Sequence, residues 1–576
     1  MARWLLLLGS GALLLAGRFE WQEAGGRFAL QGFASSLYFF LLVVPVSYYL
    51  TLAASGRRTV ARAVCLATFT IACLPYHLVG FSRFRQPVAV TPWNQPGAPP
   101  MPPDALAPGL PPAGSPAERP LLLALLVLFA LAAAWAAGAQ GLRARARRAT
   151  PAVAALAVIV AQALLHTSFR SPYTYEMLLE TPGRQYHVYL LPGGKGAVNA
   201  DAGLFTSLDE HFNGIPKPVS TMLIRRSFVH YLGSHFTYFF NPFYVYLVLN
   251  TLLWLAASAA GDDYVRRVSG SPELGRLFAG LVVAGSGFVH FVAQPMSYLA
   301  GYTALVVALW AYELLIVDTT GAVAAGDRAF LYGVVLGLCA ATYDLVPLYP
   351  TLLLYAGFRR ASLKWTAVGI AVASLVGIGF LLLQHGILGL PVDATNSGYV
   401  LGAGRGVMAV LGAAAPALLY EQTARFLVVY AQDLVYAFAV AGLVLAAAGV
   451  VFVADRRVTV WIALLLLPSL LTIAFFHYGG VRWGRVAFSA IPRLAYSAYP
   501  AIYLGAAVAL DGARRALART RLAPAAPYLP WAVLLVLLAY HNSDVFGFRN
   551  PQYHFYWPTP IGCDPYAAPA SCAEVS

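Results

Sequence analysis

A polar stretch at residues 199–226 concentrates groups that could do chemistry in a chain of which only 11% is charged. Carboxylates can act as a general base or bind a divalent metal together with phosphates. The candidates for the base are Asp201, Asp209 and Glu210, and the candidate ligands for Mg²⁺ or Mn²⁺ are Asp209, Glu210 and His211. The alternative interpretation is a solvated loop in which the acids cap a short amphipathic helix.

The same stretch carries three cations, Lys217, Arg225 and Arg226. They could bind a phosphate, because guanidinium and ammonium groups donate charge-assisted hydrogen bonds to its oxygens. They could also extend to lipid headgroups while their aliphatic stems stay in apolar surroundings.

The elements that must position these groups are membrane helices. Hydrophobic residues make up 59% of the 576 residues and the mean hydropathy is +0.67, whereas soluble domains are about half apolar and a quarter charged. Long apolar runs recur along the chain, and about 20 residues of helix cross a bilayer. Backbone groups left unpaired in lipid are costly, so these runs must be helices. The sequence predicts an all-α polytopic membrane protein.

We expect about 15 crossings. They lie near residues 3–17, 34–54, 63–81, 120–139, 151–168, 239–258, 276–292, 298–317, 329–342, 344–357, 365–384, 425–452, 459–477, 491–511 and 527–541. The first is either a retained helix or a signal peptide. Residues 329–357 are too short for two full spans, which predicts a tight pair of short helices or a re-entrant hairpin.

The formal net charge of +14 is a topology signal rather than a sign of nucleic-acid binding, because the arginines gather in short loops. Short basic loops stay in the cytoplasm. These loops contain Arg57, Arg58 and Arg62; Arg143, Arg145, Arg147 and Arg148; Arg266 and Arg267; Arg359, Arg360 and Lys364; Arg456 and Arg457; and Arg514, Arg515, Arg519 and Arg521. We therefore expect a multi-pass protein of the bacterial inner membrane with its C-terminus on the outer, periplasmic side.

This path divides the chain into three parts. Residues 1–150 would be accessory membrane helices with a Pro-rich outer loop, residues 151–541 a membrane core with a large outer loop at 169–238, and residues 542–576 an outer tail. Within the large loop, the alternating pattern of "RQYHVYLLPGG", residues 184–194, predicts a short strand ending in a turn.

Cysteine placement fits the same path. Cys65, Cys73 and Cys339 fall in expected spans, where a small apolar side chain is the simple interpretation. Cys563 and Cys572 fall in the outer tail, where a disulfide could persist.

Three further arginines, Arg482, Arg485 and Arg493, fall on the outer side despite the charge rule. They could bind an anion such as a phosphate, or form structural ion pairs with the acids of the 169–238 loop. Other ionisable residues lie at membrane depth, where such groups are expected to face a cavity or a site. These are Asp344, Glu421 and Asp433.

Three stretches together resemble the GT-C superfamily of membrane glycosyltransferases. Residues 214–257 resemble that family's passage from first outer loop to helix, through Lys217-Pro218, Asn241-Pro242 and Asn250. Residues 284–316 are similar to its helix, short outer turn and helix. Residues 492–510, "PRLAYSAYPAIYLGAAVAL", resemble a late segment of the family through Arg493, Tyr496 and Pro500.

The resemblance implies transfer of a sugar from a polyprenyl-phosphate donor to a glycan, lipid or protein acceptor on the outer face of the membrane. The family's catalytic aspartate would fall on Asp201 or Asp209, often with a divalent metal, and Arg493 would face the donor phosphate. Fixed cations would stabilise the charge that develops on the leaving phosphate. A single displacement would invert the anomeric carbon.

Other classes remain open at this point. A polymerase or ligase of the O-antigen type is also many-helical, with a large outer loop and arginines, but it would join preassembled glycans without an aspartate base. A secondary transporter would show related halves with polar groups at mid-bilayer, and the sequence has no evident internal repeat. A protein that has lost activity and serves as a scaffold is the last alternative.

Overall fold

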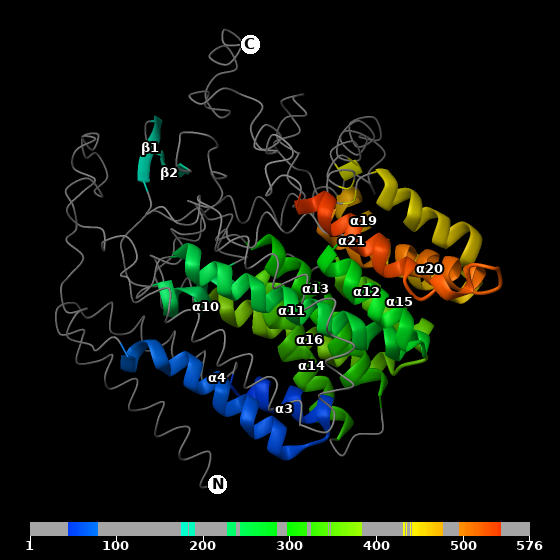
Figure 1. Ribbon diagram of the computed structural model, residues 1–576. Coiled ribbons are helices and arrows are strands. Elements are labelled where there is room, and N and C mark those ends of the chain that lie inside the picture. The colour runs from blue at the N-terminus through cyan, green and yellow to red at the C-terminus, as the bar shows by residue number, and fades with distance from the viewer. Residues whose placement is uncertain are drawn as a thin grey trace, which may run out of the picture.

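The computed structural model describes residues 44–78, 174–181, 184–190, 227–237, 242–284, 297–318, 324–343, 345, 347–382, 430–431, 434, 438, 440–475 and 495–542. Helices dominate this part of the chain, and the long ones lie side by side (Figure 1). The expected spans 3–17, 120–139 and 151–168 lie outside the described residues.

The elements are, in order, α3 (Val44–Ser55), α4 (Arg58–Leu78), β1 (Thr174–Thr181), β2 (Arg184–Leu190), α10 (Phe228–Thr237), α11 (Pro242–Ser269), α12 (Pro272–Ala284), α13 (Tyr298–Tyr312) with its π-helical continuation η6 (Glu313–Val317), α14 (Ala325–Thr342), α15 (Leu348–Arg359), α16 (Leu363–Leu382), the π-helical η8 (Gly449–Val453), α19 (Arg456–Phe475), the 3₁₀ turn η11 (Ala495–Ala498), α20 (Tyr499–Leu517), the 3₁₀ turn η12 (Ala523–Ala525) and α21 (Leu529–Asn542). Residues 329–357, expected to form a tight pair of short helices or a re-entrant hairpin, lie mainly in α14 and α15, which have 18 and 12 residues.

Among the described residues, two helices are long and apolar enough to cross a membrane, at Tyr298–Val317 and Leu363–Phe380. The first is mostly buried in the bundle, whereas only 22% of the second, in α16, is buried. Leu375 and Ile378 are exposed, and the helix is apolar on all sides. An exposed apolar surface of this kind is unfavourable for a soluble domain in water, whereas it is favourable in contact with lipid.

Small residues let α14 and α16 pack closely. A Cβ on Gly333 would lie 2.5 Å from Cβ of Val372, and one on Gly337 would lie 2.6 Å from Cβ of Val376. The two glycines are four residues apart and therefore share one face of α14, as in the small-residue interfaces of membrane helices. This contact fixes α16 beside the core.

β1 and β2 pair antiparallel, with Thr174 opposite Leu190 and Thr181 opposite Arg184 (Figure 1). The strand expected from residue 184 onward is confirmed over Arg184–Leu190. This hairpin is the departure from an all-helical chain within the described residues, and it falls in the expected outer loop.

The same loop region also contains a helix that the sequence did not predict, α10. Phe228 and Tyr231 are buried and meet the ring of Phe380 on α16 at centroid distances of 5.7 and 6.1 Å. α10 is therefore part of the packed core, so residues 228–237 belong to the bundle and not to the expected outer loop.

The described basic loops gather at one end of the bundle, called the basic end from here on. Arg359 donates from Nη2 to the carbonyl of Arg267 at 3.4 Å, which joins two of these loops. Trp461, five residues after Arg456, donates to Tyr264 at 2.8 Å. A Cβ on Gly512, near the arginines that end α20, would lie 2.6 Å from Val453. The one-sided charge that the positive-inside rule anticipates is therefore present among these loops.

Both cysteines with described side chains, Cys65 and Cys339, are free and buried. The simple interpretation of these two as small apolar residues is confirmed. Cys563 and Cys572 lie outside the described residues.

Candidate functional site

Most residues predicted to do chemistry lie outside the part of the chain that the structure describes. These are Asp201, Asp209, Glu210, His211, Lys217, Arg225, Arg226, Arg482, Arg485 and Arg493, together with Asp344, Glu421 and Asp433. Tyr496 is the one predicted site residue that the structure describes, and it lies at the end of the bundle opposite the basic end.

Tyr496 lies in η11 and is buried. Its ring meets Tyr343, the residue that ends α14, edge to face at a centroid distance of 4.8 Å. Tyr343 in turn meets Tyr298 at the start of α13 at 6.1 Å. Its ring lies against Gly301, where a Cβ would be 2.7 Å from Cγ of Tyr343. We call Tyr298, Tyr343 and Tyr496 the tyrosine cluster.

A buried histidine connects α10 to the same end. His230 Nδ1 lies 2.6 Å from the hydroxyl of Tyr246 on α11, and its Nε2 lies 3.1 Å from Oγ of Ser297. Ser297 immediately precedes Tyr298, so this chain of hydrogen bonds adjoins the tyrosine cluster. Either neutral tautomer satisfies both bonds, since Tyr and Ser hydroxyls can each donate or accept. The histidine therefore holds α10 in place against α11 and α13.

A second group of hydrogen-bonded hydroxyls adjoins Tyr496 through the next residue, Ser497. Ser497 Oγ lies 2.9 Å from the hydroxyl of Tyr430 and 2.8 Å from Oγ of Ser469 on α19. All three side chains are buried. Because buried hydroxyls are costly without partners, these bonds fix η11 between α19 and the segment around residue 430.

A small apolar cavity lies between α13, α15, α19 and α20. Pro500, four residues after Tyr496, and Tyr355 are among its lining residues, and its walls are almost wholly hydrocarbon, with Leu305, Leu309 and Pro468 among them. Its free volume of about 10 Å³ is that of a single water-sized group, so it accommodates neither an isoprene unit nor a polar ligand.

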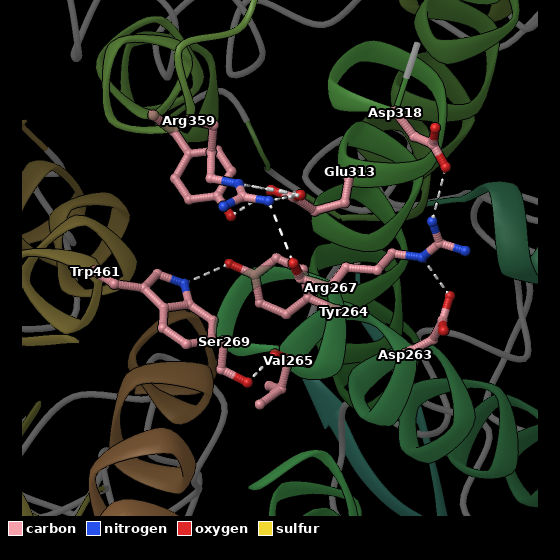
Figure 2. A network of polar contacts seen from close by, with 10 residues as sticks. Asp263, Tyr264, Val265, Arg267, Ser269, Glu313, Asp318, Arg359 and Trp461 are labelled. Carbon is pink, nitrogen blue, oxygen red and sulfur yellow. Dashed lines mark hydrogen bonds and ion pairs between the residues drawn. The ribbon is translucent and has the colours of Figure 1, made fainter. Parts of the chain in front are cut away.

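A second polar centre lies at the basic end, built around Glu313 at the start of the π-helical turn η6 (Figure 2). Glu313 is buried, and Arg359 binds both of its oxygens, with Nη2 to Oε2 at 2.7 Å and Nε to Oε1 at 2.9 Å. The hydroxyl of Tyr355 donates to Oε1 at 2.7 Å. Glu313 was not singled out from the sequence, although an acid inside the apolar run 298–317 is a recognisable signal.

The network extends from this ion pair through Arg267, which lies between Asp263 and Asp318 in Figure 2. Its Nε is 2.7 Å from Asp263 and its Nη1 is 3.2 Å from Asp318. Burial alone would raise the pKa of Asp263, but hydrogen bonds from Arg267 and Trp310 and the nearby arginine charges outweigh it and lower that pKa. Asp263 therefore stays ionised.

Tyr264, next along α11, accepts a hydrogen bond from Nε1 of Trp461 at 2.8 Å. Burial raises the pKa of Tyr264 far above its usual value, so its hydroxyl stays protonated. Through these contacts the network joins α11, η6, α15 and α19. Each of its acids already binds a cation, which suits a structural junction better than a reacting centre.

No group of three or more His, Cys, Asp or Glu is placed to bind a metal ion among the described residues. The expected ligands Asp209, Glu210 and His211 are not among them. No protein-family model matches the chain, and comparison with curated proteins finds no similar sequence.

Proposed function

We propose that the protein is a multi-pass membrane glycosyltransferase that moves a sugar from a polyprenyl-phosphate donor to a glycan, lipid or protein acceptor. Its site lies at the end of the bundle opposite the basic end, on the outer face of a bacterial inner membrane. The reaction is a single displacement that inverts the anomeric carbon.

The observation that carries the proposal is the meeting of the three stretches that resemble the GT-C superfamily. His230 and Tyr246 belong to the first stretch and Ser297 to the second, and they share one chain of hydrogen bonds. Tyr298 of the second stretch reaches Tyr496 of the third through Tyr343. Residues as far apart in the sequence as His230 and Tyr496 thus contribute to one end of the bundle, as a composite site requires.

The exposed apolar surface of α16 gives a second line of support. A polyprenyl-phosphate keeps its tail in lipid while its phosphate and sugar meet an aqueous acceptor. The exposed apolar side chains on α16, Leu375 and Ile378 among them, suit a surface in contact with lipid.

In this proposal Asp201 or Asp209 deprotonates the acceptor hydroxyl, and Arg493 binds the donor phosphate. Fixed cations and a divalent metal, if one is bound, stabilise the charge on the departing phosphate. The carboxylate supplies proton transfer, which contributes about 10²–10⁴-fold in rate.

The test is sugar transfer by the full chain reconstituted in vesicles, with a radiolabelled polyprenyl-phosphate sugar and single Asp201→Asn and Asp209→Asn variants. We expect one of the two to lose at least about 100-fold in rate while the other keeps most of its activity. Asp327→Asn is the matched control, because Asp327 is an exposed aspartate in the first turn of α14 at the basic end.

Full activity in both variants, or transfer of preassembled glycan without any use of a single-sugar donor, would contradict the proposal. A product with retained anomeric configuration would contradict the single displacement. Binding of the donor by both variants, followed in the same vesicles, separates a lost base from a lost fold.

A further inference from the structure

The start of α19 and the turn between α20 and α21 form an exposed, strongly basic patch. Their six arginines outnumber two aspartates. These are Arg456, Arg457, Arg514, Arg515, Arg519 and Arg521, with Asp455 and Asp511. The two segments adjoin, since a Cβ on Gly512 would lie 2.6 Å from Val453. We call this surface the arginine patch.

The aspartates of the patch are already engaged. Asp511 binds Arg514 at 2.7 Å and Arg515 at 3.2 Å. Asp455 accepts a hydrogen bond from the backbone N–H of Val458 at 2.8 Å and so caps α19. Four arginines remain that are exposed and form no ion pair with the described residues. They are Arg456, Arg457, Arg519 and Arg521.

The turn that carries two of these arginines is held by its own hydrogen bonds. The hydroxyl of Thr520 donates to the carbonyl of Leu517 at 2.8 Å and accepts from the N–H of Leu522 at 3.1 Å. The 3₁₀ turn η12 (Ala523–Ala525) is joined to α21 (Leu529–Asn542) by three turn residues. Arg519 and Arg521 are therefore presented on a fixed backbone, which lowers the entropic cost of binding a ligand.

Large apolar side chains border the patch and are exposed. Phe452 is 83% exposed on the α19 side, and Tyr528 and Leu522 are 71% and 62% exposed on the α20–α21 turn. Guanidinium groups flanked by aromatic and aliphatic side chains match the boundary between headgroups and acyl chains, where aromatic residues gather. A phospholipid surface accommodates both kinds of side chain at once, since its phosphates bind the guanidinium groups and its acyl chains cover the apolar groups.

We propose that the arginine patch binds the headgroups of anionic phospholipids in the cytoplasmic leaflet. The unpaired guanidinium groups bind headgroup phosphates, while Phe452, Leu522 and Tyr528 enter the acyl boundary. Clusters of four or more arginines beside a membrane helix are suited to such lipids, and each contributes about fivefold in affinity near an anionic surface. This inference rests only on the membrane orientation within the proposed function, not on sugar transfer.

The test compares the full chain with two triple variants that lose the same charge. Arg457→Gln, Arg519→Gln and Arg521→Gln neutralise the patch. Arg57→Gln, Arg58→Gln and Arg62→Gln neutralise the exposed basic turn between α3 and α4 and serve as the matched control. Each protein is reconstituted in vesicles of equal parts phosphatidylglycerol and phosphatidylcholine, then extracted in mild detergent, and its retained lipids are counted by native mass spectrometry.

We expect the chain and the control to retain phosphatidylglycerol in preference to phosphatidylcholine, and the patch variant to lose at least about fivefold of that preference. Replacing the same three arginines by lysine keeps the charge and should keep most of the preference. Protease accessibility of the α20–α21 turn in the vesicles verifies that the orientation is unchanged.

Equal retention of the two lipids by the unmodified chain would overturn the proposal. So would an equal loss of preference in the control, because the effect would then follow total charge and not this surface. The proposal would also be overturned if the patch variant inserted in the opposite orientation and the lysine variant showed no lipid preference. In that case the arginines would have only a role in membrane topology.

Discussion

Breaking the buried ion pair between Glu313 and Arg359 should cost more stability than breaking a less buried pair of the same length. The side chains of Glu313 and Arg359 are 1% and 12% exposed, with Oε2 and Nη2 2.7 Å apart. Asp511 and Arg514 are also 2.7 Å apart, but 14% and 31% exposed. Because the two ion pairs have the same length, a difference in the stability lost when each is broken reports the difference in their burial.

Removing one partner of a buried pair leaves a charge without compensation and costs about 3–5 kcal/mol. Glu313→Gln keeps one acceptor oxygen but removes the negative charge, so the guanidinium of Arg359 is left with neutral acceptors, among them the Arg267 carbonyl at 3.4 Å. We expect a loss of about 3 kcal/mol in the free energy of unfolding. Arg359→Met should cost about 5 kcal/mol, because it leaves the deeper carboxylate unpaired.

The assay is unfolding of the purified protein in detergent by increasing dodecyl sulfate, followed by circular dichroism. The double variant Glu313→Gln with Arg359→Met should be more stable than Arg359→Met alone, since it removes the orphaned charge. Asp511→Asn, the control, should cost about 1 kcal/mol or less. Equal losses for Glu313→Gln and Asp511→Asn would refute the reasoning, as would a double variant whose loss is the sum of the single losses.

Two further predictions concern packing and pH. Gly333→Leu should lower the free energy of unfolding by about 3 kcal/mol, because a Cβ at this position would lie 2.5 Å from Val372. Gly357→Ala is the control and should have little effect, since nothing lies within 4 Å of a Cβ there. Equal melting temperatures of the two variants in detergent would contradict this prediction. The lowered pKa of Asp263 means that its contribution to stability is present above the ordinary aspartate pKa and is lost as the pH falls through the lower, folded value. Asp263→Asn should therefore reduce stability at neutral pH and flatten its decline in acid, and an unchanged acid profile of melting temperature would contradict the assignment.

Local pattern was enough to predict that the described part of the chain is mainly helical and to place several of its helices. The expected runs at 298–317 and 365–384 match α13 with η6 and α16, because apolar side chains over a full helical length have few other stable arrangements in lipid. The strand from Arg184 was equally predictable, since its side chains alternate with a period of two. The gathering of arginine loops at one end also follows from their alternation along the chain.

The candidate site was less accessible to sequence reasoning. Tyr496 was named from a resemblance, but its neighbours Tyr343 and Tyr298 were not, because nothing local relates residues so far apart. α10 was missed for the same reason: its stability comes from the contact of Phe228 and Tyr231 with Phe380, about 150 residues later. The acids and arginines expected to react in sugar transfer stay predictions.

Local sequence was enough to show that the chain is mainly helical and apolar and that many of its arginines lie in short loops, since the pairing of backbone groups and hydropathy act over a few turns. The contacts between distant segments show that Glu313 meets Arg359, that His230 joins Tyr246 to Ser297, and which of the described arginines form no ion pair. Those outcomes depend on which helix faces come together. Packing chooses among many near-equal pairings of apolar surfaces, and no single segment contains the information for that choice.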